Sequence, residues 1–493
     1  MKKKVIVIGG GIAGLTAGVY ALRCGFDATI LESHSIAGGN CTSWKRGGYL
    51  FEGGMHWLTG SGENEPINAL WRTIGALDDT VTIHTPEPFI EYDHKGTPVR
   101  FYRNVDTTEK HLIETAPDDE KEIKKLCGSI RRVKGISMPV TDIRGVRVTK
   151  KNRLPISSLF AALSALRTMK KFSGMSKKEF VGKFTNEGIR GLLSASISET
   201  AGGGFLLLTL GSLANGDGGF PEGGSLPFVE RIVRRFTDMG GELLCGTRAD
   251  KIITENGKAA GVMTKGNTMK ADAVIVTADT MAIDRLFDTP PSSRWLDTMR
   301  TVTEPTMVTF VSLGIDADLR RYHKNRIIKL EHPISLASHT YEYMTVNNYA
   351  SDPAYSPEGK AAVTVQLDGD TYDFWKDAAS NGSYAGEKKR IADAVIAELT
   401  ANMLEINGKV QVTDVATPLT YERYCGNWKG SWMTEMTPKM KLRTYPAAIK
   451  GLNNVYFAGQ RMMPPGGLPA ALMSGRTAVQ YLCRDTDTVF ISE

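Results

Sequence analysis

Cysteine is scarce in this sequence, and no two cysteines lie close enough to form a recognised motif. The six cysteines are scattered and form no CxxC or CxxxxC motif; they are Cys24, Cys41, Cys127, Cys245, Cys425 and Cys483. This spacing predicts neither a zinc site nor a disulfide framework. We therefore expect a protein of a reducing compartment, and the cytoplasm fits best.

Long hydrophobic runs are also missing. The longest uniformly apolar stretch near the middle of the chain, FLLLTL at residues 205–210, is far shorter than the ~20 residues that span a bilayer. The N-terminal MKKKVIVIGGG carries positive charge like a signal peptide, but its apolar run stops after four residues, which indicates a strand. The sequence predicts no transmembrane helix. Its 493 residues, 41% hydrophobic and 23% charged, suit two or three globular domains.

Acidic residues are nearly absent between residues 121 and 184. This window holds 17 Lys and Arg against three acidic residues, a net charge of +14, whereas the rest of the chain carries −8. Within it, residues 155–172 place apolar side chains at helical spacing beside basic ones. The pattern is typical of a helix lying on anionic lipid, so we predict peripheral contact with the inner face of the membrane through residues 121–184. The alternative is an ordinary amphipathic helix with a solvated basic face.

The same window argues against a nucleic-acid partner. It holds few aromatic residues and no recognisable nucleic-acid module. Basic charge without such a module does not indicate nucleic-acid binding. We expect no nucleic acid.

A strand, a glycine loop, a helix and a second strand open the chain. Residues 5–8 are a short β-branched run, residues 15–22 fit a helix, and residues 28–31 fit a second strand. Between the first two, Gly9, Gly11 and Gly14 form GxGxxG. These glycines permit a tight turn, a close backbone approach to a pyrophosphate, and packing of helix on strand. The start of the helix offers amide N–H groups to phosphate.

An acidic residue closes the second strand. Glu32 lies 23 residues after Gly9, where it can accept hydrogen bonds from the adenosine ribose. An acid at this position argues against a 2′-phosphate, so the motif predicts FAD or NAD.

A second glycine pair follows, in SIAGGNCTSWKRGGYLFEGGMHW at residues 35–57. This stretch resembles the FAD-binding amine oxidase and phytoene desaturase superfamily, above all its branch of retinol saturases, carotenoid isomerases and phytoene desaturase-related proteins. The resemblance implies FAD as cofactor, with Gly38 and Gly39 beside the pyrophosphate. Many relatives carry Arg after this glycine pair, whereas Asn40 stands here.

Two later blocks keep the order of the same superfamily. Residues 220–262 look like its P.GG helix and hairpin, in which the residue matching Ala249 contacts adenine through its backbone. Residues 453–482 look like its C-terminal flavin motif, in which a helix beginning near Pro469 directs its amides at the flavin. Such a helix end stabilises the negative charge of reduced flavin. Many relatives carry Asp where Gln460 stands, and we expect this amide to bond a ribityl hydroxyl.

The resemblance thus assigns a complete set of cofactor contacts. They are Gly9, Gly11, Ile12, Ala13, Gly14, Glu32, Ser33, Gly38, Gly39, Asn40, Met55, His56, Ala249, Thr277, Ala278, Gly459, Gln460, Gly467, Leu468 and Pro469. We expect no metal.

The blocks also imply a fold class and a domain organisation. We expect an α/β protein with a Rossmann-type FAD-binding domain that is discontinuous in sequence (1–85, 216–290 and 450–493). An inserted α+β substrate-binding domain would comprise residues 86–215, helical and basic, and 291–449. A second GxGxxG unit and a redox cysteine pair are both absent from the sequence, which excludes the disulfide reductases that carry two dinucleotides. Electrons would pass to or from the substrate, oxygen, a quinone or a nicotinamide.

The resemblance implies an FAD-dependent oxidoreductase that desaturates or saturates carbon–carbon bonds of a hydrophobic polyene or isoprenoid. Flavin N5 exchanges a hydride, so an apolar substrate needs placement over the ring and, for reduction, one proton donor. Redox-neutral isomerisation of a polyene or unsaturated fatty acid is the alternative. An amine oxidase and a non-catalytic flavin-binding scaffold are further alternatives. The candidate proton donors are His56, Tyr341, Tyr343, Tyr421 and Glu422.

Only His56 is tied to the flavin by its motif position. It would face the flavin ring and either donate a proton or polarise the ring. The alternative is a histidine that hydrogen-bonds the flavin or packs at the cavity mouth. We expect Trp57 to be a cavity wall.

Overall fold

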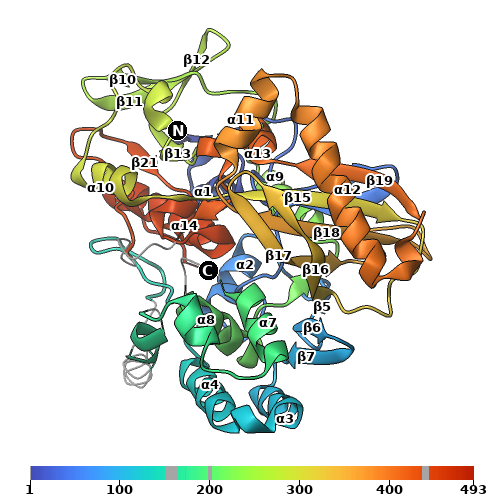
Figure 1. Ribbon diagram of the computed structural model, residues 1–493. Coiled ribbons are helices and arrows are strands. Elements are labelled where there is room, and N and C mark those ends of the chain that lie inside the picture. The colour runs from blue at the N-terminus through green and yellow to red at the C-terminus, as the bar shows by residue number, and fades with distance from the viewer. Residues whose placement is uncertain are drawn as a thin grey trace.

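Five short parallel strands form the sheet that carries the glycine motif (Figure 1). The computed structural model describes residues 2–151, 165, 167–172, 174–197, 202–435 and 443–492. In sheet order the strands are β21 (Val455–Phe457), β13 (Ala273–Val276), β1 (Lys4–Ile8), β2 (Asp27–Leu31) and β9 (Glu242–Leu244). The expected α/β class, with a parallel sheet assembled from distant segments, is confirmed.

Both faces of this sheet are covered, as parallel sheets require. Val5 and Val7 of β1 pack on α1 (Ile12–Arg23), α9 (Ser225–Asp238) and α14 (Gly467–Asp485). Ile6 and Ile8 point the other way, into a core shared with a three-stranded meander. The meander comprises β10 (Lys251–Glu255), β11 (Lys258–Thr264) and β12 (Asn267–Lys270).

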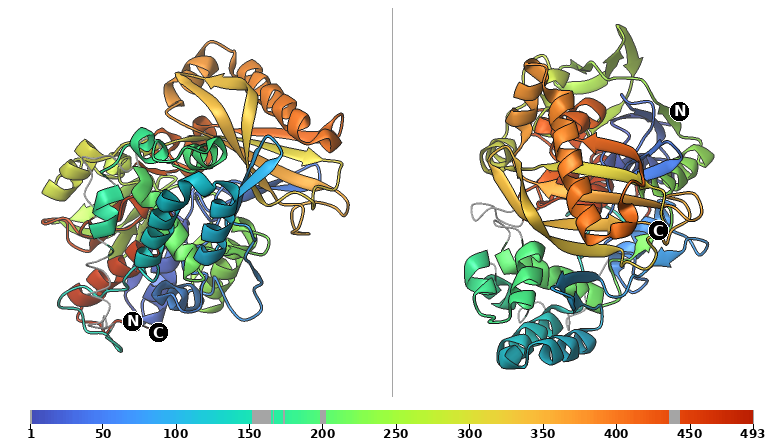
Figure 2. Two further views of the ribbon diagram at one scale, coloured as in Figure 1. Left: turned by 60° about the horizontal axis from the view of Figure 1, so that its bottom comes forward. Right: turned by 45° about the vertical axis from the view of Figure 1, so that its right-hand side comes forward.

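A second, seven-stranded sheet lies beside the first (Figures 1 and 2). Its order is β19 (Val410–Ala416), β15 (Val308–Ile315), β18 (Ala361–Asp368), β17 (His339–Asn348), β16 (Asn325–Leu336), β6 (Ile90–His94) and β7 (Thr97–Phe101). Only β16 and β6 pair in parallel. Helix α12 (Tyr384–Asn402) crosses one face, against Val363, Val365 and Leu367 of β18. Because side chains alternate along a strand, Thr364, Gln366 and Asp368 point to the other face.

A lobe of helices closes the lower end of the molecule in Figure 1. It contains α3 (Val105–Thr115), α4 (Glu120–Val133), α6 (Lys177–Val181), α7 (Glu187–Ser196) and α8 (Gly202–Ala214). The expectation of a helical segment 86–215 needs one correction, because residues 90–101 form β6 and β7 and join the seven-stranded sheet. Alternating buried residues such as Tyr92, Val99 and Phe101 explain this pairing.

Shorter elements connect these layers. They are β3 (Ser43–Arg46), β4 (Tyr49–Glu52), α2 (Pro66–Thr73), β5 (Ile83–His84), η1 (Pro117–Asp119), β8 (Phe220–Pro221), η2 (Ile283–Leu286), α10 (Arg294–Val302), β14 (Pro305–Thr306), α11 (Tyr372–Ser380), η3 (Leu404–Ile406), α13 (Pro418–Cys425), η4 (Trp428–Gly430), β20 (Met433–Thr434) and η5 (Gln460–Met462).

The basic window 121–184 is partly neutralised where the structure describes it. In α4, Lys124 pairs with Glu120, and Arg131 pairs with Asp106 and Glu109, all at 2.5 to 2.6 Å. Most of the predicted lipid-facing helix, residues 155–172, lies outside the described residues. In the described part of the chain, every helix is too short or too polar to cross a bilayer.

Candidate cofactor and substrate site

The GxGxxG turn has the geometry that its spacing predicts. Gly9 adopts a φ of +107°, and a Cβ on Gly14 would lie 1.9 Å from the Gly9 carbonyl oxygen. The Thr277 hydroxyl, 2.9 Å from the oxygen of Ile8 and 3.0 Å from that of Gly9, braces the turn from β13. Ile12 and Ala13 open α1 directly behind it. The N-terminus of α1 is therefore presented without side chains in front of it.

The second glycine pair lies against this turn. Gly38 donates its N–H to the Gly10 carbonyl at 2.9 Å, and Gly11 and Gly38 form a parallel bridge. Gly38 and Gly39 both have positive φ, +128° and +58°, which glycine adopts at little cost. Two facing backbone loops without side chains fit a pyrophosphate.

Glu32 is buried and connects the GxGxxG turn to the segment that follows β2. One carboxylate oxygen accepts the N–H of Gly10 at 2.7 Å, and the other accepts the N–H of His34 at 2.7 Å and the Ser33 hydroxyl at 3.3 Å. Each oxygen has two lone pairs, so the first keeps one for a ribose hydroxyl.

A cavity of about 530 Å³ opens beside Glu32. Its lining includes Ser33, Arg248 and Arg285, and Ala249 is buried directly behind Arg248. Burial, followed by the charge of Arg248, lowers the pKa of Arg285. The cavity is lined by residues of both signs, because Asp373 and Glu422 also line it.

The C-terminal block lies next to the glycine loops. Gly459 exchanges two 3.0 Å hydrogen bonds with the Ser474 hydroxyl of α14. Gln460 accepts the N–H of Gly467 at 3.1 Å and donates to the Trp432 carbonyl at 2.9 Å. Its amide keeps one hydrogen and one lone pair for a cofactor hydroxyl. Helix α14 begins at Gly467, two residues before the predicted start, so Leu468 and Pro469 lie in its first turn.

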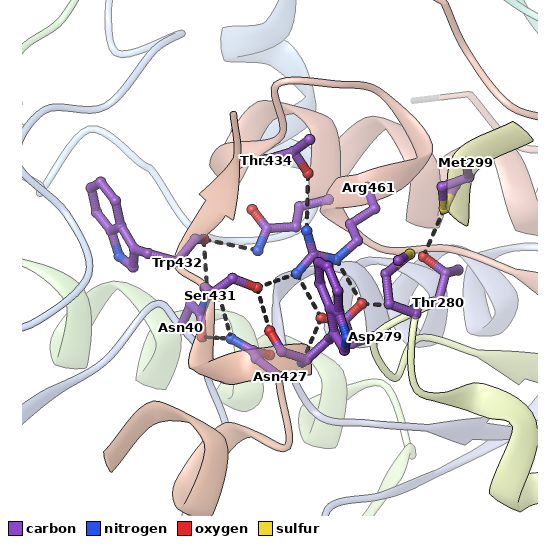
Figure 3. A network of polar contacts seen from close by, with 12 residues as sticks. Asn40, Asp279, Thr280, Met299, Asn427, Ser431, Trp432, Thr434 and Arg461 are labelled. Atoms are coloured by element: carbon purple, nitrogen blue, oxygen red, sulfur yellow. Dashed lines mark hydrogen bonds and ion pairs between the residues drawn. The ribbon is translucent and has the colours of Figure 1, made fainter. Parts of the chain in front are cut away.

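Asn40 bonds to protein where many relatives carry Arg. It donates to the Trp432 carbonyl at 3.1 Å and accepts from the Asn427 amide at 2.5 Å (Figure 3). The side chain therefore connects the second glycine loop to residues 427–432.

A buried ion pair at the centre of this network was not predicted from the sequence. Figure 3 shows Arg461 between Asp279 and Thr434. Arg461 donates to the two Asp279 oxygens at 2.6 and 2.8 Å, and to the Thr434 hydroxyl at 3.0 Å. Burial alone would raise the pKa of Asp279, but the charge and hydrogen bonds of Arg461 outweigh it and lower the pKa. Asp279 follows Thr277 and Ala278 at the end of β13. A single acidic residue directly after an apolar strand is the sequence feature that could have predicted this buried carboxylate.

Glu52 anchors the loop that carries His56. It is fully buried and accepts five hydrogen bonds, from the N–H groups of Gly54, Met55 and Ser225 and from the hydroxyls of Ser225 and Tyr355. The loop is thereby bound to the N-terminus of α9. A Cβ on Gly53 would lie 2.3 Å from the Trp44 ring, and one on Gly54 would lie 2.4 Å from the Asn40 carbonyl. Contacts within the protein thus already require both glycines.

His56 reaches across to the second sheet. Its Nε2 lies 2.8 Å from the Gln366 amide nitrogen of β18, and its Nδ1 is buried with no partner among the described residues. The ring stacks on Phe310 and meets Trp432 edge-on, at centroid distances of 5.9 and 5.5 Å. Burial, and then the positive charge of Lys324, lower the pKa of His56 to about 3.

The His56 ring is therefore neutral at physiological pH. When the Gln366 amide donates to Nε2, the single ring proton is on Nδ1. His56 then presents a free N–H donor. Gln366 was not predicted from the sequence, where no local pattern marks it.

The other predicted donors are spread out. Tyr421 is buried and donates to the Gly53 carbonyl at 2.8 Å, whereas Glu422 accepts the Tyr372 hydroxyl and lines the 530 Å³ cavity. Tyr341 donates to the backbone carbonyl of Asp368 at 2.8 Å, and Tyr343 packs edge-on against Tyr92. The structure thus brings only Tyr421 to the His56 loop.

Asp368 is an unpredicted candidate on the same strand face as Gln366. Loss of solvation, and then the negative charge of Glu435, raise the pKa of its carboxyl to about 6, although the residue keeps exposed surface. A carboxyl of this kind exchanges protons near neutral pH.

A family model described as flavin containing amine oxidoreductase matches residues 12–483. The chain belongs to this family. It is therefore a flavin-dependent oxidoreductase with FAD as cofactor, and the glycine loops, Glu32 and the C-terminal block are the part of the family fold in which the cofactor is expected.

Curated relatives of this flavin oxidoreductase match along nearly its whole length. Prolycopene isomerase from Daucus carota is 22% identical over 97% of this chain and 80% of its own. Phytoene desaturase (lycopene-forming) from a Paracoccus species is 22% identical, covering 98% of both chains. All-trans-retinol 13,14-reductase from Danio rerio is 22% identical over 95% of this chain and 85% of its own.

Solved structures agree on the fold. An oxidoreductase from Methanosarcina mazei has a TM-score of 0.60 at 16% identity, covering 97% of this chain and 100% of its own. Cyclohexylamine oxidase from Brevibacterium oxydans has a TM-score of 0.61 at 14% identity, covering 99% and 100%.

Proposed function

We propose that this flavoprotein desaturates or saturates carbon–carbon bonds of a hydrophobic polyene or isoprenoid. The observation that carries the proposal is the full-length likeness to a phytoene desaturase, a prolycopene isomerase and a retinol reductase. The names of these proteins describe reactions at carbon–carbon double bonds of carotenoids and a retinoid. Bound FAD would supply the hydride acceptor or donor.

In this proposal the cofactor is held by residues 1–85, 216–290 and 450–493, and the substrate by residues 86–215 and 291–449. His56 positions the reacting centre by donating its Nδ1–H, because a neutral imidazole with a pKa of about 3 is a hydrogen-bond donor rather than an acid at neutral pH. Asp368 is the candidate proton donor or acceptor, because it lies two residues from Gln366 on the same strand face and its carboxyl has a pKa of about 6.

The proposal includes a source for the substrate. Exposed basic residues of α4, among them Lys121 and Arg132, support contact of residues 121–184 with anionic lipid on the cytoplasmic face of a membrane. An apolar substrate would then enter from the bilayer. The electron partner would be oxygen, a quinone or a nicotinamide.

Redox-neutral isomerisation of a double bond is the second candidate. It is favoured by the likeness to prolycopene isomerases from Daucus carota and an Oncidium hybrid. In that case the flavin would be returned unchanged at the end of each turnover.

The test is to incubate purified holoenzyme with a lipid extract of its host and to record lipid masses and the flavin spectrum. A mass change of two hydrogens establishes desaturation or saturation, and an altered retention time at constant mass establishes isomerisation. An unchanged lipid fraction together with an unreactive flavin would overturn the proposal in favour of a flavin-binding scaffold.

The His56 role is tested in the same assay. His56→Ala should lose most turnover, while His56→Gln, which restores an N–H donor, should keep part of it at equal FAD occupancy. His332→Gln, at a histidine side chain that is 89% exposed, is the matched control. Full activity in His56→Ala would remove His56 from the mechanism.

A further inference from the structure

Two cations lie close to the His56 loop without an anionic partner. Lys324, half-buried just before β16, places its Nζ 2.9 Å from the centroid of the Phe220 ring and 5.0 Å from that of Tyr349. Its ammonium makes no hydrogen bond or ion pair with any residue that the structure describes. Aromatic faces attract a cation, but they do not replace the hydrogen bonds that water offers to an ammonium.

Arg103 is the second cation. Its two terminal nitrogens donate to the carbonyls of Asp217 and Gly218, each at 2.7 Å, while its Nε is buried without a partner. It forms no ion pair within the described ranges. The guanidinium is thus held in place by two backbone carbonyls, and it keeps its charge and three of its five N–H donors, the Nε–H among them.

The nearby acids are occupied by other donors. Glu52 accepts its five hydrogen bonds from the His56 loop, α9 and Tyr355. Asp352 accepts the N–H groups of Gly223 and Ala354 at 2.9 and 3.0 Å. Asp217 accepts from Gly60, Ser61 and Ser212. The negative charges of Glu52 and Asp352 lower the positive electrostatic potential around Lys324, but neither residue forms a hydrogen bond or ion pair with it.

Both cations adjoin the wall that carries His56 and Trp57. The Arg103 guanidinium lies 5.9 Å from the centroid of the Phe89 ring, and Trp57 meets the same ring edge-on at 6.1 Å. Leu58 donates to the Gly219 carbonyl at 2.8 Å, which places the His56 loop beside Phe220 and hence beside Lys324.

A cavity open to solvent reaches Arg103, one of the two cations. A cavity of about 470 Å³ is lined by Arg103, Arg131, Lys134 and Leu213, with Asp106 as its only acid. Leu213 also approaches Gly218, next to Trp57. Positive charge at an opening attracts anions, and aromatic walls beyond it suit an apolar chain.

We propose that Lys324 and Arg103 bind the carboxylate of an amphipathic substrate whose unsaturated hydrocarbon chain extends past Trp57 to His56. The substrate class is a long-chain unsaturated acid rather than a neutral hydrocarbon. A carboxylate supplies the hydrogen-bond acceptors that the Lys324 ammonium and the Arg103 Nε lack. Its binding therefore offsets the cost of removing these two cationic groups from water, whereas a neutral polyene offers them no acceptor. This inference rests on the proposed function, because it identifies the substrate of the same site.

The experiment measures binding to the holoenzyme through perturbation of the flavin spectrum, with linoleic acid and its methyl ester as probes. The acid should bind at least about tenfold more tightly than the ester, as expected for a charge-assisted pair. Lys324→Met should abolish this preference and leave ester binding unchanged, whereas Lys324→Arg should retain it. Lys329→Met, at an exposed lysine of β16, five residues after Lys324, is the control.

Ester affinity and FAD content report whether Lys324→Met is folded. Equal binding of acid and ester by the wild type, or an undiminished preference in Lys324→Met, would overturn the inference. If neutral polyenes react while acids neither bind nor react, the proposed function stands and this inference fails. If acids bind through Lys324 but their unsaturation never changes, the carboxylate site stands and the proposed function fails.

Discussion

Replacing Glu52 by Gln tests whether one buried carboxylate holds the His56 loop against the FAD-binding half of the molecule. The substitution keeps size and shape but turns one of the two acceptor oxygens into an NH2 donor. With the amide oxygen facing Gly54, Met55 and the Ser225 hydroxyl, the new NH2 faces the Ser225 N–H and the Tyr355 hydroxyl. The Tyr355 hydroxyl can rotate to accept, whereas the Ser225 N–H cannot.

The magnitude follows from these contacts. One buried N–H left without a partner costs about 1–3 kcal/mol, and each remaining bond loses about 1 kcal/mol when its acceptor is no longer charged. A neutral amide costs less to bury than a carboxylate, which offsets part of this loss. We expect a net destabilisation of about 3–5 kcal/mol, a large share of the ~5–15 kcal/mol that stabilises a folded protein.

Urea unfolding of the holo-protein, followed by tryptophan and flavin fluorescence, measures the effect. Flavin release in Glu52→Gln should precede loss of the tryptophan signal, because the loop donates the Gly53 N–H to the Thr42 carbonyl, three residues after the second glycine pair. Glu63→Gln is the control, since the Glu63 side chain is 86% exposed and such changes cost within about 0.5 kcal/mol. A loss below about 1 kcal/mol in Glu52→Gln would refute the reasoning.

Three further predictions concern charges. Arg461→Met leaves Asp279 as an unpaired buried carboxylate and should lower the urea-unfolding free energy by about 3–5 kcal/mol, while the double variant with Asp279→Asn should recover part of it. If Asp368 donates the proton, turnover should fall as pH rises through about 6, where the carboxyl loses it, and Asp368→Asn should flatten this limb of the pH–rate profile. Burial holds the pKa of Lys324 at about 7, so linoleate affinity should fall as pH rises through about 7 and stay flat in Lys324→Arg. The charged or titratable groups around Lys324 are Glu52, Asp352, Arg103, His56 and Tyr349.

The cofactor half of the molecule was predictable because its signals are local. Gly9 and Gly14 are required by contacts a few residues apart, and Glu32 is recognisable by its distance from the turn.

The contacts that complete the site depend instead on distant pairing. Asp279 and Arg461 are 182 residues apart, and Gln366 reaches His56 across 310. Lys324 resembles any surface lysine until the fold places Phe220 and Tyr349 beside it. Strands β6 and β7 were missed for the same reason, since a two-stranded hairpin is stable only when a sheet such as that of β16 accepts it.

The sheet order has a consequence for how the protein is made. The central strand β1 comes from the first residues of the chain, but its neighbour β13 ends near residue 276, and β21, beyond β13, comes only at residues 455–457. Helix α14, which packs on α1, follows still later. A ribosome must therefore release almost the entire chain before the five-stranded sheet and the helices that cover it are complete. Thr277 can brace the glycine turn once β13 has been released, but the C-terminal block is missing until the last residues. Cofactor loading therefore belongs to the end of synthesis.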